Sequence, residues 1–385
     1  MDKKYKKRVI RTFSLASFLN DLGSDMITPI WPLFVTTFLG ASMATLGLID
    51  GLGNALVSIS QALSGYISDR IKKRKIFVWL GYLFASFSRV GYAFSTMWQH
   101  LIPFKILDRF GKMRDAPRDA LIANVSNHKD RGKSFGILEA MDKLGGLCGV
   151  IASILLFGLL GYKKLFLVAA VPSLIAVLLI IFIIKEKKSN HIKIYRGIHF
   201  KDINNNLRLF LVLGSIFSLG AFSYSFLLVF AKDFGFSVGL VSVLYLIFAA
   251  FASVSALPFG KMADKIGRKN VLGLSFVLWI LVCLSFIFLN SYVGIILAFV
   301  LYGLHRGALD PVQKTFVSEL APENYKASVL GGYQMLLGIV ALPASLIAGL
   351  LWDKIDFMAP FYFSMGLAVL AFIMLVFVKE NKNIK

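Results

Sequence analysis

Long runs of apolar residues, separated by short polar segments, follow one another along the whole chain. A membrane-spanning helix needs about 20 consecutive apolar residues, and a helix satisfies its own backbone polar groups inside lipid. The pattern predicts an all-α polytopic membrane protein with twelve transmembrane helices. These cover residues 12–34, 44–68, 76–96, 98–123, 133–160, 163–184, 208–231, 238–262, 270–289, 292–318, 328–351 and 357–378. The fourth and tenth are the weakest predictions, because each carries several charges.

Composition agrees with this pattern. Hydrophobic residues are 57% and charged residues 16% of the 385 residues, and the mean hydropathy is +0.73, whereas soluble proteins average about 25% charged residues. Cys148 and Cys283 both lie in apolar runs, so neither a disulfide framework nor a cysteine metal site is indicated. No cleavable signal peptide is expected, because the apolar run after residues 1–11 leads into a full span.

The positive charge is concentrated on one side of the predicted membrane. With both termini inside, the cytoplasmic segments hold 29 Lys and Arg against 9 Asp and Glu, an excess of 20 out of a formal net charge of +21. This is the positive-inside distribution of membrane proteins. It predicts a multi-pass protein of the cytoplasmic (inner) membrane with cytoplasmic N- and C-termini. It leaves no basic excess for a nucleic-acid partner, so DNA or RNA binding is not expected.

The two halves of the chain repeat each other. A stretch with glycine, aspartate and basic residues after the second span returns 195 residues later, after the eighth. Its residues are Gly65, Asp69, Arg70 and Arg74 in the first half and Gly260, Asp264, Lys265 and Arg268 in the second. Such repeats are typical of secondary transporters. They predict an N-terminal six-helix bundle at 1–184, a cytoplasmic linker at 185–207 and a C-terminal six-helix bundle at 208–385.

The repeated stretch predicts a conformational latch. Glycine lets two helices approach closely, and an aspartate near a helix C-terminus is disfavoured by the helix dipole, so it needs basic partners. Such a cluster can hold neighbouring helices in one conformation and release them in another. The alternative, a basic stop-transfer loop, explains the Lys and Arg residues but not the repeated Gly and Asp.

Together these motifs make the chain resemble the major facilitator superfamily, whose signature between helices 2 and 3 is this Gly-to-basic stretch. More narrowly it is similar to a prokaryotic branch of poorly assigned substrate. The motifs of that branch are Phe18-Leu-Asn20-Asp21 and Met26-Ile-x-Pro29 in the first span, Asp108-Arg109-x-Gly111-Lys112 and Ala116-Pro117-Arg118-Asp119-Ala120-Leu121-Ile122-Ala123 in the fourth, Ala140-Met141-Asp142 in the fifth, Tyr302-Gly303-Leu304 in the tenth, and Ala341 to Asp353 in the eleventh. The resemblance implies two bundles around a central cavity lined chiefly by helices 1, 4, 7 and 10, with alternating access by rocking.

Two details depart from the family's patterns. After Gly111-Lys112 the branch usually has a further glycine, and here the run to Arg114 is one residue shorter. Within a helix this rotates the later residues by about 100°. In the fifth span, Gly145-Gly146-x-x-Gly149 is similar to the signature of exporting antiporters, but the proline of that signature is absent, so support for drug efflux is weak.

Charged side chains within the predicted spans are the candidates for a substrate and proton cavity. A charge at the bilayer centre costs at least about 2.5–3.5 kcal/mol on insertion scales, so each one is a functional candidate by default. The resemblance places Arg109 near substrate or proton sites. Arg306, Asp310 and Lys314 have the alternative of neutralising one another along one helix. The predicted cavity residues are Asp21, Asp25, Asp108, Arg109, Asp142, His305, Arg306 and Asp310.

Asp21 is the leading candidate for the coupling proton site, with Asp142 as its rival. Desolvation raises the pKa of a carboxylate and a nearby arginine lowers it, so alternating exposure is expected to toggle such a group between protonation states. The remaining intramembrane charges have expected structural roles: Arg114, Arg118 and Asp119 at the interface, Lys143 as a partner of Glu139 or Asp142, and Arg89 and Asp50 as gate or interdomain contacts.

Nothing in the sequence resembles a catalytic constellation, a cofactor site or a metal site, and direct ATP drive is not expected without a phosphate-binding loop. The prediction is therefore a non-enzymatic secondary transporter for a small, zwitterionic or anionic solute. It is predicted to be coupled to H+ and to work as a monomer in the lipid bilayer. The alternatives are a drug or siderophore/metal-chelate exporter, a non-transporting receptor or scaffold, and an intramembrane enzyme or lipid flippase.

Overall fold

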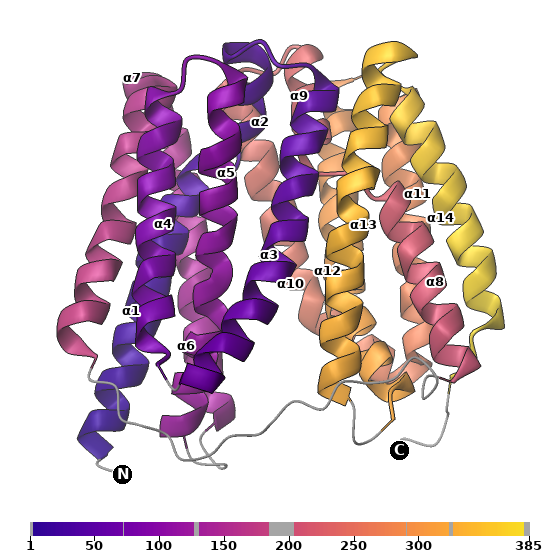
Figure 1. The fold of residues 1–385 in the computed structure, drawn as a ribbon. Coiled ribbons are helices and arrows are strands. Elements are labelled where there is room, and N and C mark those ends of the chain that lie inside the picture. The colour runs from indigo at the N-terminus through magenta and orange to yellow at the C-terminus, as the bar shows by residue number, and fades with distance from the viewer. Residues whose placement is uncertain are drawn as a thin grey trace. The chain divides into compact units, whose positions relative to one another are not determined.

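The structure, a computed structural model, describes residues 3–71, 73–126, 131–184, 204–289, 291–322 and 326–380. Every regular element among these residues is a helix (Figure 1). The first half contains α1 (Lys3–Ile27), α2 (Trp31–Leu33), the π-helix η1 (Phe34–Phe38), α3 (Met43–Ile71), α4 (Lys75–Phe94), the 3₁₀ helix η2 (Trp98–His100), α5 (Leu101–Phe110), the 3₁₀ helix η3 (Gly111–Arg114), α6 (Asp115–Val125) and α7 (Arg131–Ile183). The second half contains α8 (Asn205–Gly220), α9 (Ser225–Asp233), α10 (Val238–Ile266), α11 (Arg268–Phe288), α12 (Tyr292–Leu320), α13 (Lys326–Lys354) and α14 (Ala359–Phe377).

Nine stretches of the described chain are long and apolar enough to cross a membrane. One of them, Gly132–Ile183, changes direction at Gly161, whose φ of 61° is a left-handed conformation that glycine adopts without steric cost. It therefore consists of two successive helices, as the predicted fifth and sixth spans require. The first predicted span and the charged fourth one, which the structure builds as α5, η3 and α6, are not among the nine. A multi-pass helical protein is shown, and the count of twelve stays a prediction.

The chain forms two compact units. The first comprises Met1–Ala41, Leu56–Ile194 and Phe236–Ser242, and the second comprises Ser42–Ala55, Tyr195–Gly235 and Val243–Lys385. The first part of α3 thus belongs to the second unit. Most of the predicted linker lies outside the described residues, so the predicted bundle boundaries stay a prediction.

The first unit is organised around α7. Helices α1 and α4 both pack along α7, and α5 packs on α4. Where helices meet in lipid, van der Waals packing stabilises them, since lipid tails are as apolar as the side chains. This packing holds the acidic segment of α1 against α7. The core residues that fix it include Val9, Phe13 and Ala16 of α1, Val78 and Tyr82 of α4, and Ala176, Val177 and Ile180 of α7.

The second unit has an aromatic interior. Helix α11 packs on α12 and α14, and α8 packs on α13 and α14. Trp279 is 2% exposed, and its indole Nε1 donates to the Ser364 Oγ at 2.8 Å. Buried Trp needs such a partner for its N–H, so this contact fixes α11 against α14.

Candidate functional site

The two acids of α1 lie in the first unit, one turn apart. The Asn20 Nδ2 donates to the Asp21 Oδ1 at 3.0 Å, and the Thr28 Oγ1 donates to the Asp25 Oδ1 at 3.0 Å. Both carboxylates are half-buried. A methyl group at Gly146 of α7 would overlap the Asp25 carboxylate, so the acidic segment faces α7 closely.

Glycines of α7 make this approach possible. A Cβ atom at Gly145 would overlap the carbonyl oxygen of Phe18, and one at Gly149 would overlap that of Leu22. Backbone atoms cannot rotate away, so these positions need glycine as long as α1 keeps its place. The glycine motif that resembles the signature of exporters thus sets the spacing between α1 and α7 on both sides of Asp21.

Arg109 lies beside its chain neighbour Asp108. The distance from the Arg109 Nε to the Asp108 Oδ2 is 3.5 Å, and the side chains are 30% and 18% exposed. Both residues are among the predicted cavity residues. The ion pair gives the arginine an acidic partner from its own helix.

The shortened run after Lys112 falls in the 3₁₀ turn η3, between α5 and α6. A 3₁₀ residue turns by about 120° and rises about 2.0 Å, whereas an α-helical residue turns by about 100° and rises about 1.5 Å. Compared with four α-helical residues, four 3₁₀ residues therefore add about 80° of rotation and about 2 Å of rise. The loss of one α-helical residue removes about 100° of rotation and about 1.5 Å of rise. The tighter winding offsets the lost rotation to within about 20°.

Asp142 is held by an arginine of α6. The Arg118 Nη1 lies 3.9 Å from the Asp142 Oδ2 and donates to the Ser17 Oγ at 2.6 Å. The Arg118 Nε donates to the Asp119 Oδ1 at 3.0 Å. The sequence predicted Arg118 and Asp119 to be interfacial and structural, whereas Arg118 is 8% exposed and joins α1, α6 and α7. Sequence reasoning missed this arginine as the partner of Asp142. Lys143 was expected to pair with Glu139 or Asp142, and its Nζ lies 3.7 Å from the Glu139 Oε1.

His305 lies inside the second unit. It is 2% exposed, its Nδ1 lies 2.7 Å from the Ser275 carbonyl oxygen, and its ring centroid lies 5.3 Å from Trp279 and 5.8 Å from Phe217. A carbonyl oxygen only accepts, so Nδ1 carries the proton of this hydrogen bond. Such surroundings are typical of a histidine in a packed core, and its predicted part in the cavity stays a prediction.

Arg306 and Asp310 form an ion pair along α12. Their Nη2 and Oδ1 atoms are 3.0 Å apart, at spacing i, i+4, and the side chains are 39% and 47% exposed. The two charges therefore neutralise each other as the spacing indicated. Their contribution to a cavity stays a prediction.

The second-half copy of the predicted latch is an ion-pair cluster. The Arg268 Nη2 lies 2.7 Å from the Asp264 Oδ1 and 3.1 Å from the Glu319 Oε1 of α12. Glu380 accepts from the backbone N–H of Arg268 at 2.5 Å, where the N-terminus of α11 favours an anion. Arg268 therefore connects the ends of α10, α11 and α12.

The glycines of the latch do not act as expected. A Cβ atom at Gly260 would meet nothing within 4 Å, and one at Gly65 would meet only the Ala116 Cβ at 3.5 Å, an ordinary contact. The expected close helix approach is thus not made at these two positions in this conformation. The side chain of Asp69 lies outside the described part of the chain, so its predicted latch with Arg70 and Arg74 stays a prediction.

Replacement of the latch arginine is expected to slow transport without weakening solute binding. In Arg268→Gln the neutral amide cannot pair with both Asp264 and Glu319, so the helix ends lose their shared partner. We expect a transport rate lower by about tenfold, since breaking charged networks costs roughly 1–3 kcal/mol, with unchanged affinity. Rates and affinities in proteoliposomes measure this, with Lys261→Gln, an exposed charge earlier on α10, as control. A loss of affinity equal to the loss of rate would contradict the latch.

Two acids hold the first half of α3 within the second unit. Asp353 of α13 accepts from the first two backbone N–H groups of α3, at 3.1 and 2.7 Å. The buried Asp50 accepts from the hydroxyl groups of Ser223 and Ser225, at 2.9 and 2.5 Å. Helix N-termini favour anions, so Asp353 acts as an N-cap supplied by another helix. The predicted gate contact of Asp50 thus has partners within its own unit.

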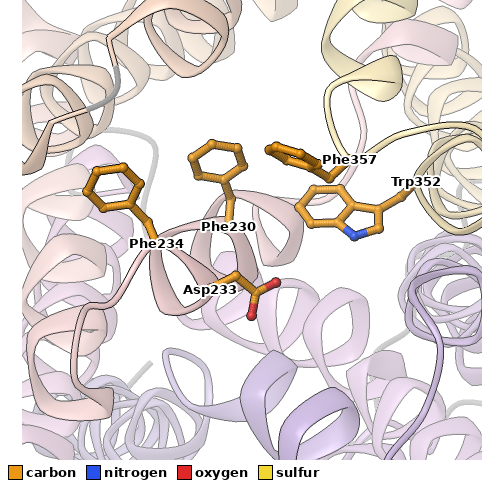
Figure 2. A pocket seen from close by; sticks show the side chains of 5 residues that line it. All are labelled: Phe230, Asp233, Phe234, Trp352 and Phe357. Carbon is orange, nitrogen blue, oxygen red and sulfur yellow. The ribbon is translucent and has the colours of Figure 1, made fainter.

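A pocket of about 380 Å³ opens at the ends of α9 and α13 in the second unit. In Figure 2 the rings of Phe357 and Trp352 lie side by side, Phe234 lies on the other side of Phe230, and the Asp233 carboxylate lies below Phe230. The Phe230 centroid is 5.9 Å from that of Phe357 and 6.4 Å from that of Trp352. Aromatic faces with one carboxylate attract organic cations.

Comparison with known proteins identifies the family. The Major Facilitator Superfamily profile matches residues 13–229 and 208–385. The chain belongs to the major facilitator superfamily. The MFS-type transporter MJ1317 of Methanocaldococcus jannaschii is 36% identical over 98% of this chain and 96% of its own length, and the multidrug resistance protein 2 of Bacillus subtilis is 25% identical over 95% and 94%. The crystal structure of the nucleoside transporter NupG aligns with a TM-score of 0.78 at 16% identity, over 97% of this chain and 100% of that one.

Membership in the superfamily confirms the predicted fold and makes the protein a multi-pass membrane transporter. The likeness to NupG, at 16% identity, shows the fold alone. Among the described residues no group of three or more His, Cys, Asp or Glu side chains is placed to hold a metal ion. The candidate site consists of the charged side chains of the first unit described above.

Proposed function

We propose that this transporter is a secondary carrier that moves a small zwitterionic or anionic solute across the cytoplasmic membrane by alternating access, driven by protons. The observation that carries the proposal is the set of charged side chains within the helices of the first unit. Its membrane-spanning helices hold the Arg109–Asp108 ion pair of α5, the ion pair of Arg118 on α6 with Asp142 on α7, and the carboxylate of Asp21 on α1. Such charges are costly in a bilayer. A solute with a carboxylate group would bind Arg109, and a proton would bind an acid of α1.

The surroundings of Asp21 support its assignment as the coupling proton site. It is half-buried, and its Oδ1 accepts from Asn20. Arg118 lies beside the rival, Asp142, in the described ion pairs. Asp25 lies one turn away, and two close carboxylates resist ionising together. A carboxylate that accepts from a neutral donor loses less stabilising interaction energy on protonation than one paired with an arginine. Asp21 is therefore better suited than Asp142 to exchange a proton during transport.

The orientation proposed for the protein has both termini in the cytoplasm, and the distribution of Lys and Arg in the loops supports it. In this orientation a proton gradient directed inward is available to Asp21 when the cavity opens outward. A single chain contains both repeats that the superfamily's fold needs. A monomer in the lipid bilayer is therefore proposed as the working form.

A second candidate function is the export of lipophilic organic cations. It is favoured by the pocket of four aromatic rings and Asp233 in the second unit, because such rings and a carboxylate attract cations. It is also favoured by the similarity to the multidrug resistance protein 2 of Bacillus subtilis.

Flux measurements in proteoliposomes test these proposals. Solutes selected by a thermal-shift screen of the purified protein are expected to accumulate when a pH gradient is imposed and to equilibrate without one. Accumulation of tetraphenylphosphonium in place of anionic or zwitterionic solutes would favour the second candidate. Binding of a solute without flux would point to a receptor and contradict both proposals. Movement of lipid alone would point to a flippase and would also contradict both.

Arg109→Lys is expected to impair transport although the positive charge remains. The planar guanidinium binds a carboxylate through two parallel hydrogen bonds, whereas the ammonium group is a compact point charge. We expect a loss of solute affinity on the order of tenfold or more, since hydrogen bonds to charged groups contribute about 1.5–3 kcal/mol. The measurements are transport and its pH profile, with Arg11→Lys, at an exposed position of α1, as control. A variant with wild-type rate and pH profile would show that Arg109 is not a binding residue.

A further inference from the structure

Arg89 of α4 is a fully buried arginine that joins three helices of the first unit. It is 1% exposed. Its Nη1 donates to the Ala169 carbonyl oxygen at 2.8 Å and to the Ser173 Oγ at 2.5 Å, both on α7. Its Nη2 donates to α1, namely to the Asn20 carbonyl oxygen at 3.1 Å, the Asn20 Oδ1 at 3.3 Å and the Ser24 Oγ at 3.2 Å. The sequence suggested a gate or interdomain contact, and the structure places Arg89 inside one unit instead.

All five of these acceptors are uncharged. Within the described residues no ion pair includes Arg89. A buried charge without an opposite charge beside it is costly, and polar side chains alone would join the same helices at a lower cost. The cost therefore points to a role that needs a guanidinium.

Helix α1 is shaped to admit this guanidinium. A Cβ atom at Gly23 would overlap both the Arg89 Nη1 and the Ala169 carbonyl oxygen. Only glycine at this position allows the guanidinium to lie between α1 and α7 without moving the backbone. The contact is therefore built into both helices and is not an accident of one flexible side chain.

The guanidinium determines which way the Asn20 amide points. An arginine only donates hydrogen bonds, so the amide must turn its oxygen toward Arg89. The Ser173 Oγ, which receives a hydrogen bond from Arg89, donates to the same Asn20 Oδ1 at 2.9 Å. With its oxygen fixed by two donors, the amide has its Nδ2 on the opposite side, where it donates to the Asp21 Oδ1 at 3.0 Å.

We propose that Arg89 is a positioning residue for Asp21, acting through the Asn20 amide so that Oδ1 always accepts a hydrogen bond and Oδ2 is the oxygen that exchanges the proton. The proposal rests on the proposed function in one respect, the coupling role of Asp21. Asp21 interacts electrostatically with Asp25 of α1, Arg89 of α4 and Asp142 of α7. None of these supplies the directed hydrogen bond that Asn20 gives.

Infrared difference spectroscopy of the full chain tests the positioning without reference to transport. When Asp21 is protonated at Oδ2, its C=O group is Oδ1, and the hydrogen bond from Asn20 lowers the C=O stretching frequency. The band is assigned by its loss in Asp21→Asn, and Asn20→Leu gives the frequency without the hydrogen bond. Arg89→Lys is expected to shift the band in the same direction as Asn20→Leu. Ser24→Ala is the matched control, because this hydroxyl accepts from Arg89 without contacting Asn20.

Transport gives the second readout. Arg89→Lys is expected to lower accumulation driven by a pH gradient on the order of tenfold or more, because small displacements of a reacting group have effects of this size, and to leave exchange near the wild-type rate. If Arg89→Lys does not fold, Ser173→Ala replaces it, and a band shift in the same direction is expected. A band that stays in place in both variants while it moves in Asn20→Leu would overturn the proposal. If Asp21→Asn still concentrates solute, the coupling role falls, and the band still decides the positioning.

Discussion

Asp21→Asn is expected to abolish accumulation of solute against a gradient while exchange at equal concentrations continues. The amide has nearly the shape of the carboxylic acid but cannot take up and release a proton. Its oxygen still accepts the hydrogen bond from Asn20, so the local packing of α1 stays as it is. Exchange needs only that the loaded carrier changes its access, without net proton movement. Uphill transport needs the proton step in every cycle.

The measurement is uptake into proteoliposomes with an imposed pH gradient, beside counterflow at equal concentrations. Asp356→Asn is the control, since this loop carboxylate accepts from the Met358 N–H and an asparagine oxygen keeps that cap. Asp142→Asn is measured in parallel. If Asp21→Asn concentrates solute and Asp142→Asn does not, the coupling site is Asp142. If both concentrate it, the coupling ion is not a proton.

The membrane helices could be predicted well from the sequence, because hydropathy reports directly on the solvent that surrounds a segment. The turn near residue 161, for example, follows from two apolar runs whose sum is too long for one span. The first and fourth spans have too many charges for the same rule. Those charges belong to the candidate site, so the rule is weakest where function adds polar groups.

Partners across helices could not be predicted from the sequence. Arg118 and Asp142 are far apart in the chain and meet only because α6 and α7 bring them together. The role of Arg89 has the same origin, since its acceptors lie on α1 and α7. Depth along a helix follows from residue number, but the direction in which a side chain points depends on how its helix packs.

The π- and 3₁₀ segments are a further part of the fold that hydropathy alone does not predict. The 3₁₀ turn η3 begins at Gly111, two residues after Arg109, and mid-helix 3₁₀ turns often mark functional hinges. The missing residue in the motif gave a signal at this place: helix geometry predicts a lost rotation of about 100°, of which four 3₁₀ residues restore about 80°. A departure from a family's spacing can thus indicate a change in backbone winding rather than a lost function.

Gly149→Ala is expected to lower both stability and uphill transport, because the new methyl group would overlap the Leu22 carbonyl oxygen of α1. A backbone atom cannot move alone, so the helix must shift as a whole. Overpacking costs about 1–3 kcal/mol, and a displacement of about 1 Å at a reacting group lowers rates on the order of a hundredfold. Asp21 lies next to the point of overlap, so we expect accumulation to fall much more than the thermal midpoint would suggest.

The matched control lies on the same helix. A Cβ atom at Gly158 of α7 would meet nothing within 4 Å, so Gly158→Ala is expected to be silent, or to stabilise the helix by up to about 1 kcal/mol. Thermal unfolding in detergent and accumulation in proteoliposomes compare the two variants. Equal behaviour of Gly149→Ala and Gly158→Ala would mean that α1 and α7 are not in close contact during transport. The acids of α1 would then owe their position to the buried arginine of α4 and not to the glycines of α7.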